Sequence, residues 1–78
     1  MGEKLPSLKA RQLTRFLHQQ GFVMVHQKGS HATYKNPLTN RRVTIPIHPG
    51  KDLKRGLVHS ILNDLGLSTE EFLKQFRS

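Results

Sequence analysis

The sequence contains no cysteine. This excludes a disulfide framework and a zinc site with thiolate ligands, so packed secondary structure must hold the fold together. No hydrophobic run approaches the roughly 20 residues that are needed to cross a bilayer, and the N-terminus lacks the apolar core of a signal peptide. We therefore expect a cytoplasmic protein with no membrane partner.

Acidic and aromatic residues are also scarce. Five Asp and Glu stand against 13 Lys and Arg, which gives a formal net charge of +8. Such an excess attracts polyanions, and nucleic acid is the first candidate, ahead of an acidic protein or an anionic membrane surface. The one Tyr and four Phe are mostly needed in the core, so an aromatic platform for stacking single-stranded bases is not expected.

Three helices are predicted from apolar spacing and capping residues. The first runs from Ser7 to Gln20, with its first residue as the N-cap and Gly21 as the C-terminal cap. A second apolar stripe extends over Leu53–Leu65 and is closed by Gly66. Ser68-Thr69-Glu70-Glu71 has the form of a capping box and predicts a short third helix. Residues 1–5 are expected to form a loose or strand-like lead-in.

Three strands are predicted between the first two helices, over Phe22–Gln27, His31–Lys35 and Arg42–Ile47, with a loop at Asn36–Asn40. In the first strand, strict alternation places His26 on the same face as Phe22 and Met24, although the buried face is ambiguous. Pro46 cannot donate a ladder hydrogen bond, which predicts an edge position for the third strand.

The resulting order is α-β-β-β-α with an extra C-terminal helix. Short connections predict a three-stranded antiparallel sheet, and two amphipathic helices need one of its faces for burial. We therefore expect an α+β, two-layer sandwich with helices on one face and the other face open. This order is that of the double-stranded RNA-binding domain fold, and 78 residues are enough for one domain spanning residues 1–78.

The turn Lys28-Gly29-Ser30-His31 is the strongest candidate for chemistry. Glycine allows backbone N–H groups to approach a phosphate closely, Lys28 adds charge, and Ser30 adds a hydroxyl donor. Histidine exchanges protons near neutral pH, so His31 is a candidate general base or acid for attack by an RNA 2′-hydroxyl. The alternative is a plain hairpin turn with an exposed histidine.

Other histidines and cations have weaker claims. His48 is a candidate second acid–base group, a phosphate contact or simply a strand-end residue, and His26 is interpreted as structural. His18 and His59 are interpreted as solvated helix-face residues, and no metal-binding spacing of the HExxH kind exists. Cations that could follow a phosphate backbone, or be ordinary surface charges, are Lys35, Arg41, Arg42, Lys51, Lys54 and Arg55.

Several short motifs, in this order, together resemble the HicA toxins of prokaryotic type II toxin–antitoxin systems. They are Gly21-Phe22, Lys28-Gly29-Ser30-His31, Val43-Thr44-Ile45-Pro46-Ile47-His48, a helix with Leu57, Ile61 and Leu62, and Gly66-Leu67-Ser68-Thr69-Glu70-Glu71-Phe72-Leu73. The resemblance implies a toxin that cleaves mRNA, arrests growth, and is neutralised by a HicB antitoxin that covers its active site. It maps the catalytic histidine onto His31 and implies no required metal or other cofactor.

Two further hypotheses remain beside an RNA-cleaving toxin. A non-catalytic module that binds double-stranded RNA or the ribosome explains the charge and fold equally well, but not the Lys28-Gly29-Ser30-His31 turn. A basic surface that docks an acidic protein is the third. Among the RNA-binding candidates, the residues predicted to accompany His31 are Lys28, Gly29, Ser30, Lys35, Arg41 and Arg42, with His48 as a possible assistant.

Overall fold

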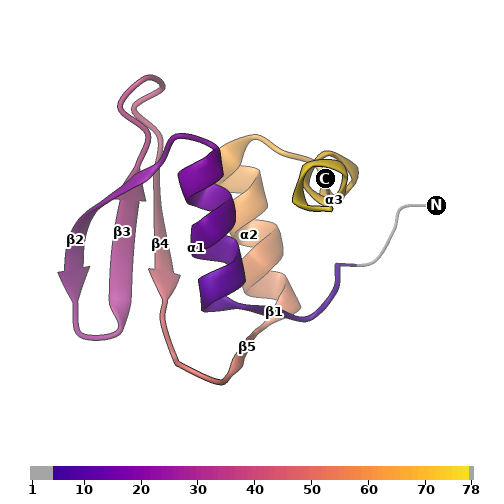
Figure 1. The fold of residues 1–78 in the computed structure, drawn as a ribbon, viewed down its shortest axis with the longest axis horizontal. Helices are drawn as coiled ribbons and strands as arrows, with labels where there is room; N and C mark the ends of the chain where they lie inside the picture. The colour runs from indigo at the N-terminus through magenta and orange to yellow at the C-terminus, as the bar shows by residue number, and fades with distance from the viewer. Residues whose placement is uncertain (1–4, 78) are drawn as a thin grey trace.

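The computed structural model describes residues 5–77 and has two layers. α1 and α2 lie side by side along one side of a three-stranded sheet, and α3 lies beyond them, away from the sheet (Figure 1). The elements in chain order are β1 (Leu8–Lys9), α1 (Ala10–Gln19), β2 (Val23–Lys28), β3 (His31–Lys35), β4 (Arg42–Pro46), β5 (Asp52–Leu53), α2 (Arg55–Leu65) and α3 (Thr69–Phe76). The expected α+β class and the order of the double-stranded RNA-binding domain fold are confirmed. Of the lead-in expected over residues 1–5, residues 1–4 lie outside the described residues.

The three-stranded sheet has the order β2-β3-β4, and both pairs of strands are antiparallel. β4 is therefore an edge strand of this sheet, as Pro46 predicted. The strand boundaries agree with the prediction to within one residue, since β2 begins and ends one residue later and β4 ends one residue earlier. Local β propensity and turn residues were thus sufficient to place the sheet.

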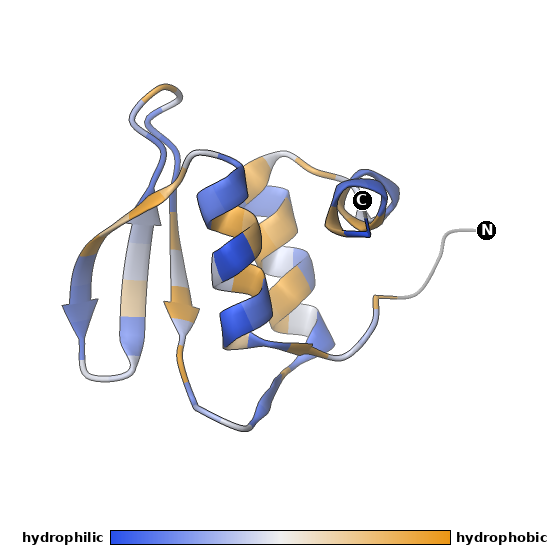
Figure 2. Ribbon diagram, viewed as in Figure 1, coloured by the Kyte–Doolittle hydropathy of each residue, from blue (hydrophilic) through white to orange (hydrophobic). Residues whose placement is uncertain are grey.

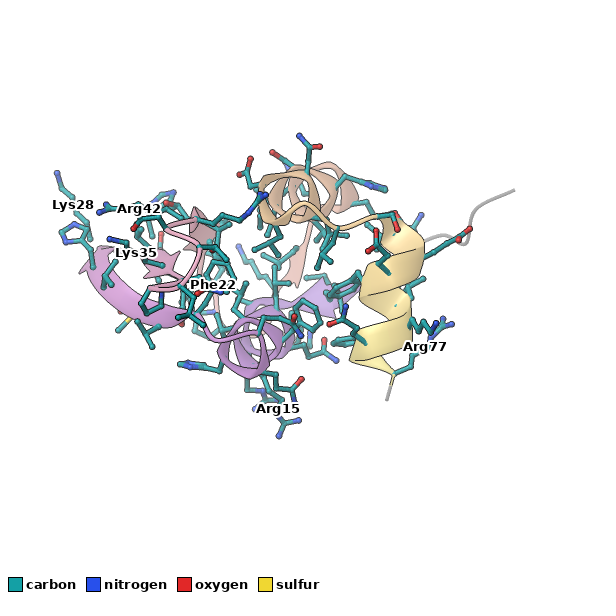
Figure 3. The ribbon with its side chains drawn as sticks, turned by 90° about the horizontal axis from the view of Figure 1, so that it is seen from above. Arg15, Phe22, Lys28, Lys35, Arg42 and Arg77 are labelled. Atoms are coloured by element: carbon teal, nitrogen blue, oxygen red, sulfur yellow. The ribbon has the colours of Figure 1, made fainter. Side chains whose placement is uncertain are left out.

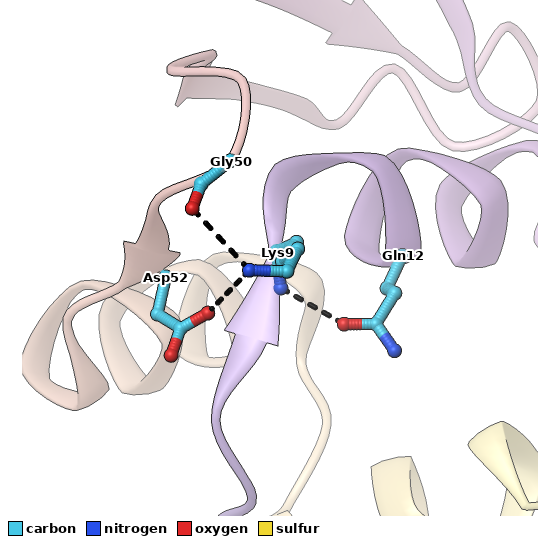
Figure 4. A network of polar contacts seen from close by, with 4 residues as sticks. All are labelled: Lys9, Gln12, Gly50 and Asp52. Atoms are coloured by element: carbon cyan, nitrogen blue, oxygen red, sulfur yellow. Dashed lines mark hydrogen bonds and ion pairs between the residues drawn. The ribbon is translucent and has the colours of Figure 1, made fainter.

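The start of α1 was predicted wrongly. Ser7 is not its N-cap, because the chain stays extended through β1, which pairs antiparallel with β5. The N-cap is Lys9, whose backbone N–H donates to Gln12 Oε1 at 2.9 Å. The Lys9 ammonium donates to Asp52 Oδ1 at 3.1 Å and to the Gly50 carbonyl at 3.4 Å (Figure 4). Long-range pairing therefore sets where this helix begins.

The other helix ends agree with the sequence. Gly21 follows α1 with φ +90° and Gly66 ends α2 with φ +74°, conformations that glycine adopts without a steric penalty. Before α3, the Glu71 backbone N–H donates to Ser68 Oγ and the Ser68 N–H donates to Glu71 Oε1. Leu53 is the exception, because it belongs to β5 rather than to α2.

The core lies between the sheet and the helices and continues under α3. α1 buries Leu13, Phe16 and Leu17, and the Phe16 ring meets the Phe72 ring of α3 edge-on with centroids 4.8 Å apart. Both main helices carry hydrophobic and hydrophilic residues on different sides (Figure 2). Within residues 5–77, no helix is long and apolar enough to cross a membrane.

Candidate functional site

The β2–β3 hairpin turns through Gly29 and Ser30. Gly29 has φ +58°, and a glycine at the first central position is what a type II′ hairpin turn requires. The Gln27 side-chain amide donates to the Gly29 carbonyl at 3.2 Å and supports the turn. The hairpin register then places His31 directly opposite Lys28.

A β-bulge at Val25 changes which way the end of β2 faces. Met24 pairs with Tyr34, but His26 pairs with Thr33, so the register shifts by one residue between them. Facing residues in an antiparallel pair project to the same side of the sheet, so the bulge sets His26 on the side of Thr33 and Met24 on the side of Tyr34. The prediction that His26 shares a face with Met24 is therefore wrong.

The side of the sheet turned away from the helices forms one surface, which we call the open face. Thr33 Oγ1 lies 3.1 Å from Thr44 Oγ1 at its centre, while Ala32 and Tyr34 of the same strand are buried on the helix side. Figure 3 shows Lys28, Lys35 and Arg42 together on the side of the sheet away from the helices. By strand register the open face comprises Val23, His26 and Lys28 of β2, His31, Thr33 and Lys35 of β3, and Arg42, Thr44 and Pro46 of β4.

The positive charge of the open face has no nearby acidic counterpart in sequence. No Asp or Glu occurs between Lys4 and Lys51, a stretch that contains α1 and all three strands of the sheet. The acidic residues that follow are Asp52, Asp64, Glu70 and Glu71. Asp52 pairs with Lys9, while Glu71 caps α3. The open face therefore presents cations that no carboxylate of its own elements neutralises.

Arg41 does not join Arg42 on the open face. Its guanidinium donates to the Asp64 carbonyl of α2 at 2.8 Å and lies against Gly66, where an added Cβ would come within 3.3 Å of it. A cation at this place satisfies a free carbonyl and opposes the negative end of the helix dipole. Arg41 therefore links the β3–β4 loop to the C-terminal end of α2.

His48 lies beyond the end of β4. The preceding residue, Ile47, donates its N–H to the Ser30 carbonyl, so the chain is still close to the hairpin turn at that point. His48 itself lines a groove of about 550 Å³ between the start of α1 and the β4–β5 loop. The groove residues are Lys9, Ala10, Arg11, Thr14, Ile47, His48, Pro49 and Gly50.

The remaining histidines lie in different surroundings. His18 of α1 meets the Tyr34 ring edge-on, with the ring centroids 5.7 Å apart. His59 is exposed on α2. His26 is exposed on β2, so its interpretation as a structural residue is not supported. Strict alternation in the sequence gives no sign of the bulge that brings it to the open face. Among residues 5–77, no three His, Cys, Asp or Glu side chains are grouped so that they could hold a metal ion.

The α-β-β-β-α order, the antiparallel sheet and its cationic open face define a small basic domain of the double-stranded RNA-binding-domain-like class. Residues 10–67 match the family described as "HicA toxin of bacterial toxin-antitoxin", and the chain belongs to that family. It is therefore a toxin of a toxin–antitoxin system, with an antitoxin as its partner. A comparison with curated proteins gave no match. The matched residues include the whole open face and leave α3 outside.

Proposed function

We propose that this toxin is a cytoplasmic endoribonuclease that cleaves mRNA on its open face, with His31 exchanging the proton of the attacking 2′-hydroxyl. The observation that carries the proposal is the register of the sheet, which gathers His31, Lys28, Lys35 and Arg42 on one exposed surface. Family membership supports the same activity, since these residues lie inside the matched segment.

Each part of the turn has a role in this proposal. Lys28, directly opposite His31, contacts the scissile phosphate. The backbone N–H groups of Gly29 and Ser30 and the Ser30 hydroxyl donate further hydrogen bonds to it. His31 removes the 2′-hydroxyl proton as that oxygen attacks, a step in which a positioned histidine contributes about 10²–10⁴-fold.

The neighbouring cations hold the rest of the RNA. Lys35 lies four residues from His31 along β3, which corresponds to roughly 13 Å of strand. Arg42 pairs with Lys35 at that end of the open face. The cations therefore extend beyond a single phosphate, and binding depends on the RNA backbone rather than on base edges.

The antitoxin in this proposal is a HicB-type protein that covers the open face. An acidic surface on that partner would match a face whose own elements contain no Asp or Glu. Coverage of His31 would block RNA from the site, so inhibition and charge pairing would share one interface.

The test is expression of wild type, His31→Ala and a matched control, His59→Ala, while growth and mRNA integrity are followed. His59 is also an exposed histidine, but it lies on α2. We expect wild type and His59→Ala to cleave mRNA and arrest growth, and His31→Ala to do neither. Intact mRNA with wild type, together with RNA binding by the purified protein, would support the non-catalytic RNA- or ribosome-binding module instead.

A further inference from the structure

His26 lies diagonally across the strand pair from His31. The pairs His26–Thr33 and Lys28–His31 are two residues apart on the same ladder and project to the same side of the sheet. Diagonal neighbours of this kind have Cβ atoms about 7 Å apart. At that separation, two imidazole rings can both contact a phosphate that lies between them. Lys28 lies opposite His31, two residues beyond His26 along β2.

No polar contact within residues 5–77 gives the His26 side chain a structural role. It is exposed, and within residues 5–77 it makes no side-chain hydrogen bond or ion pair. Around it on the open face stand Lys28 on its own strand, Thr33, His31 and Lys35 on β3, and Arg42 on β4 beyond them. None of these groups is a carboxylate that would fix the ring, so it is free to face a substrate.

RNA cleavage by a neighbouring 2′-hydroxyl requires two proton transfers. The O2′–P bond forms while the P–O5′ bond breaks, which leaves a 2′,3′-cyclic phosphate and a 5′-hydroxyl. One group takes the 2′-hydroxyl proton, and a second must give a proton to the departing O5′, because an alkoxide is a poor leaving group. The attacking and departing oxygens lie on opposite sides of phosphorus, so the two groups must flank it.

We propose that His26 is the general acid that protonates the departing O5′, while His31 acts as the base. This rests on the proposed endoribonuclease activity and completes it with the second group. His26 shares the open face with His31 and Lys28, whereas His48 lies past the strand end in the groove beside α1. The bulge at Val25 lets β2 pair at both ends while His26 projects beside His31.

The experiment compares two RNA substrates of one sequence, one with the natural linkage and one with a bridging sulfur in place of O5′ at the cleavage site. Thiolate leaves without protonation, so a general acid is needed only for the natural linkage. We expect His26→Ala to cleave natural RNA about 10²–10⁴-fold more slowly than wild type and the sulfur-bridged RNA at a rate close to that of wild type. His31→Ala should be slow on both substrates.

Other outcomes are distinguishable. Equal losses on both substrates would make His26 a binding residue, and wild-type rates with His26→Ala would leave it no role; either result overturns the proposal. Rescue by sulfur in His48→Ala or His31→Ala would assign the acid to that residue instead. If wild type cleaves neither RNA, the proposed endoribonuclease function fails rather than the assignment of His26. Circular dichroism of each variant shows that it is folded.

Discussion

The hydroxyl oxygens of Thr33 and Thr44 lie 3.1 Å apart across β3 and β4, in the middle of the open face. Thr33 faces Thr44 across the two strands. On one side of them His31 faces Pro46, and on the other side Lys35 faces Arg42. Two short side chains here leave the floor of the open face low between the end that holds His31 and the end that holds Lys35 and Arg42. An RNA backbone that contacts both ends must cross this floor.

A bulky residue on this floor should block cleavage without unfolding the protein. Thr44 is exposed on an edge strand, and tyrosine is favoured in strands, so Thr44→Tyr should fold. We expect its RNA cleavage rate to fall by at least about tenfold, because the scissile phosphate is displaced from His31. Thr44→Ser, which keeps the floor low, is the control, and equal rates for the two variants would show that RNA does not cross here.

The two adjacent arginines should have separable effects. Arg42→Gln removes a cation of the open face and should lower the salt dependence of RNA binding, by about 0.7 in the slope of log affinity against log salt. Arg41→Gln removes the bond to the Asp64 carbonyl and should lower the free energy of unfolding by about 0.5–1 kcal/mol.

Salt titrations of RNA binding and urea unfolding of both variants check these expectations. Arg42→Gln should leave the urea midpoint unchanged, and Arg41→Gln should leave the salt slope unchanged. A change of slope in Arg41→Gln equal to that in Arg42→Gln would return Arg41 to the RNA-binding surface that the sequence predicted for it. A flat salt response in the wild type would contradict the electrostatic account of binding altogether.

The sequence predicted β3 and β4 well because one face of each is buried. Val43 and Ile45 are apolar and alternate with exposed residues, so their pattern carries the register. β2 has no such pattern, since all six of its residues are exposed and both of its faces tolerate apolar and polar side chains. The sequence therefore could not reveal the bulge at Val25. For the same reason it could not show on which side of the sheet His26 lies.

Long-range contacts account for the other differences. Ser7 has the local chemistry of an N-cap, but the pairing of Leu8 with Leu53 keeps the chain extended past it. Arg41 and Arg42 are adjacent and chemically equal, yet only Arg42 lies in β4 opposite Lys35. Local propensity depends on neighbouring residues only, so it cannot predict pairings between residues that are distant in the chain.

Replacement of Gly29 and of Gly56 by alanine should change the free energy of unfolding in opposite directions. At Gly29 the space for a Cβ is open, but φ is +58°, so Gly29→Ala should lower the free energy of unfolding by about 1 kcal/mol. At Gly56, in the first turn of α2, the space is open and φ is not positive, so Gly56→Ala should raise it by about 0.5 kcal/mol.

Urea unfolding measures both effects, and Gly29→Asn supplies a control because asparagine accepts a positive φ more readily than alanine. We expect Gly29→Asn to be more stable than Gly29→Ala. If the two are equally stable, the conformation of the hairpin turn does not limit stability at this position.

RNA cleavage should persist in the presence of EDTA. In the proposed chemistry the proton transfers belong to histidine side chains and the phosphate charge is met by Lys28, so no step requires a metal ion. Cleavage rates measured with and without EDTA should agree. Complete loss of activity in EDTA that added Mg²⁺ restores would instead assign the chemistry to a metal ion.

α3 should be essential to stability although it lies outside the residues that match the family. Phe72 is fully buried and meets the Phe16 ring of α1, so α3 closes the side of the core away from the sheet. Phe72→Ala should lower the free energy of unfolding by about 3–5 kcal/mol, because it leaves a cavity that the thin core of a small protein cannot close.

The control is Lys74→Ala on the exposed side of the same helix, which should change the urea midpoint little. Because α3 lies away from the open face, Phe72→Leu, which fills most of the cavity, should retain RNA cleavage while it unfolds at lower urea than wild type. A midpoint for Phe72→Ala equal to that of Lys74→Ala would mean that α3 is not part of the cooperative core. Loss of cleavage in a folded Phe72→Leu would mean that α3 acts on the site as well.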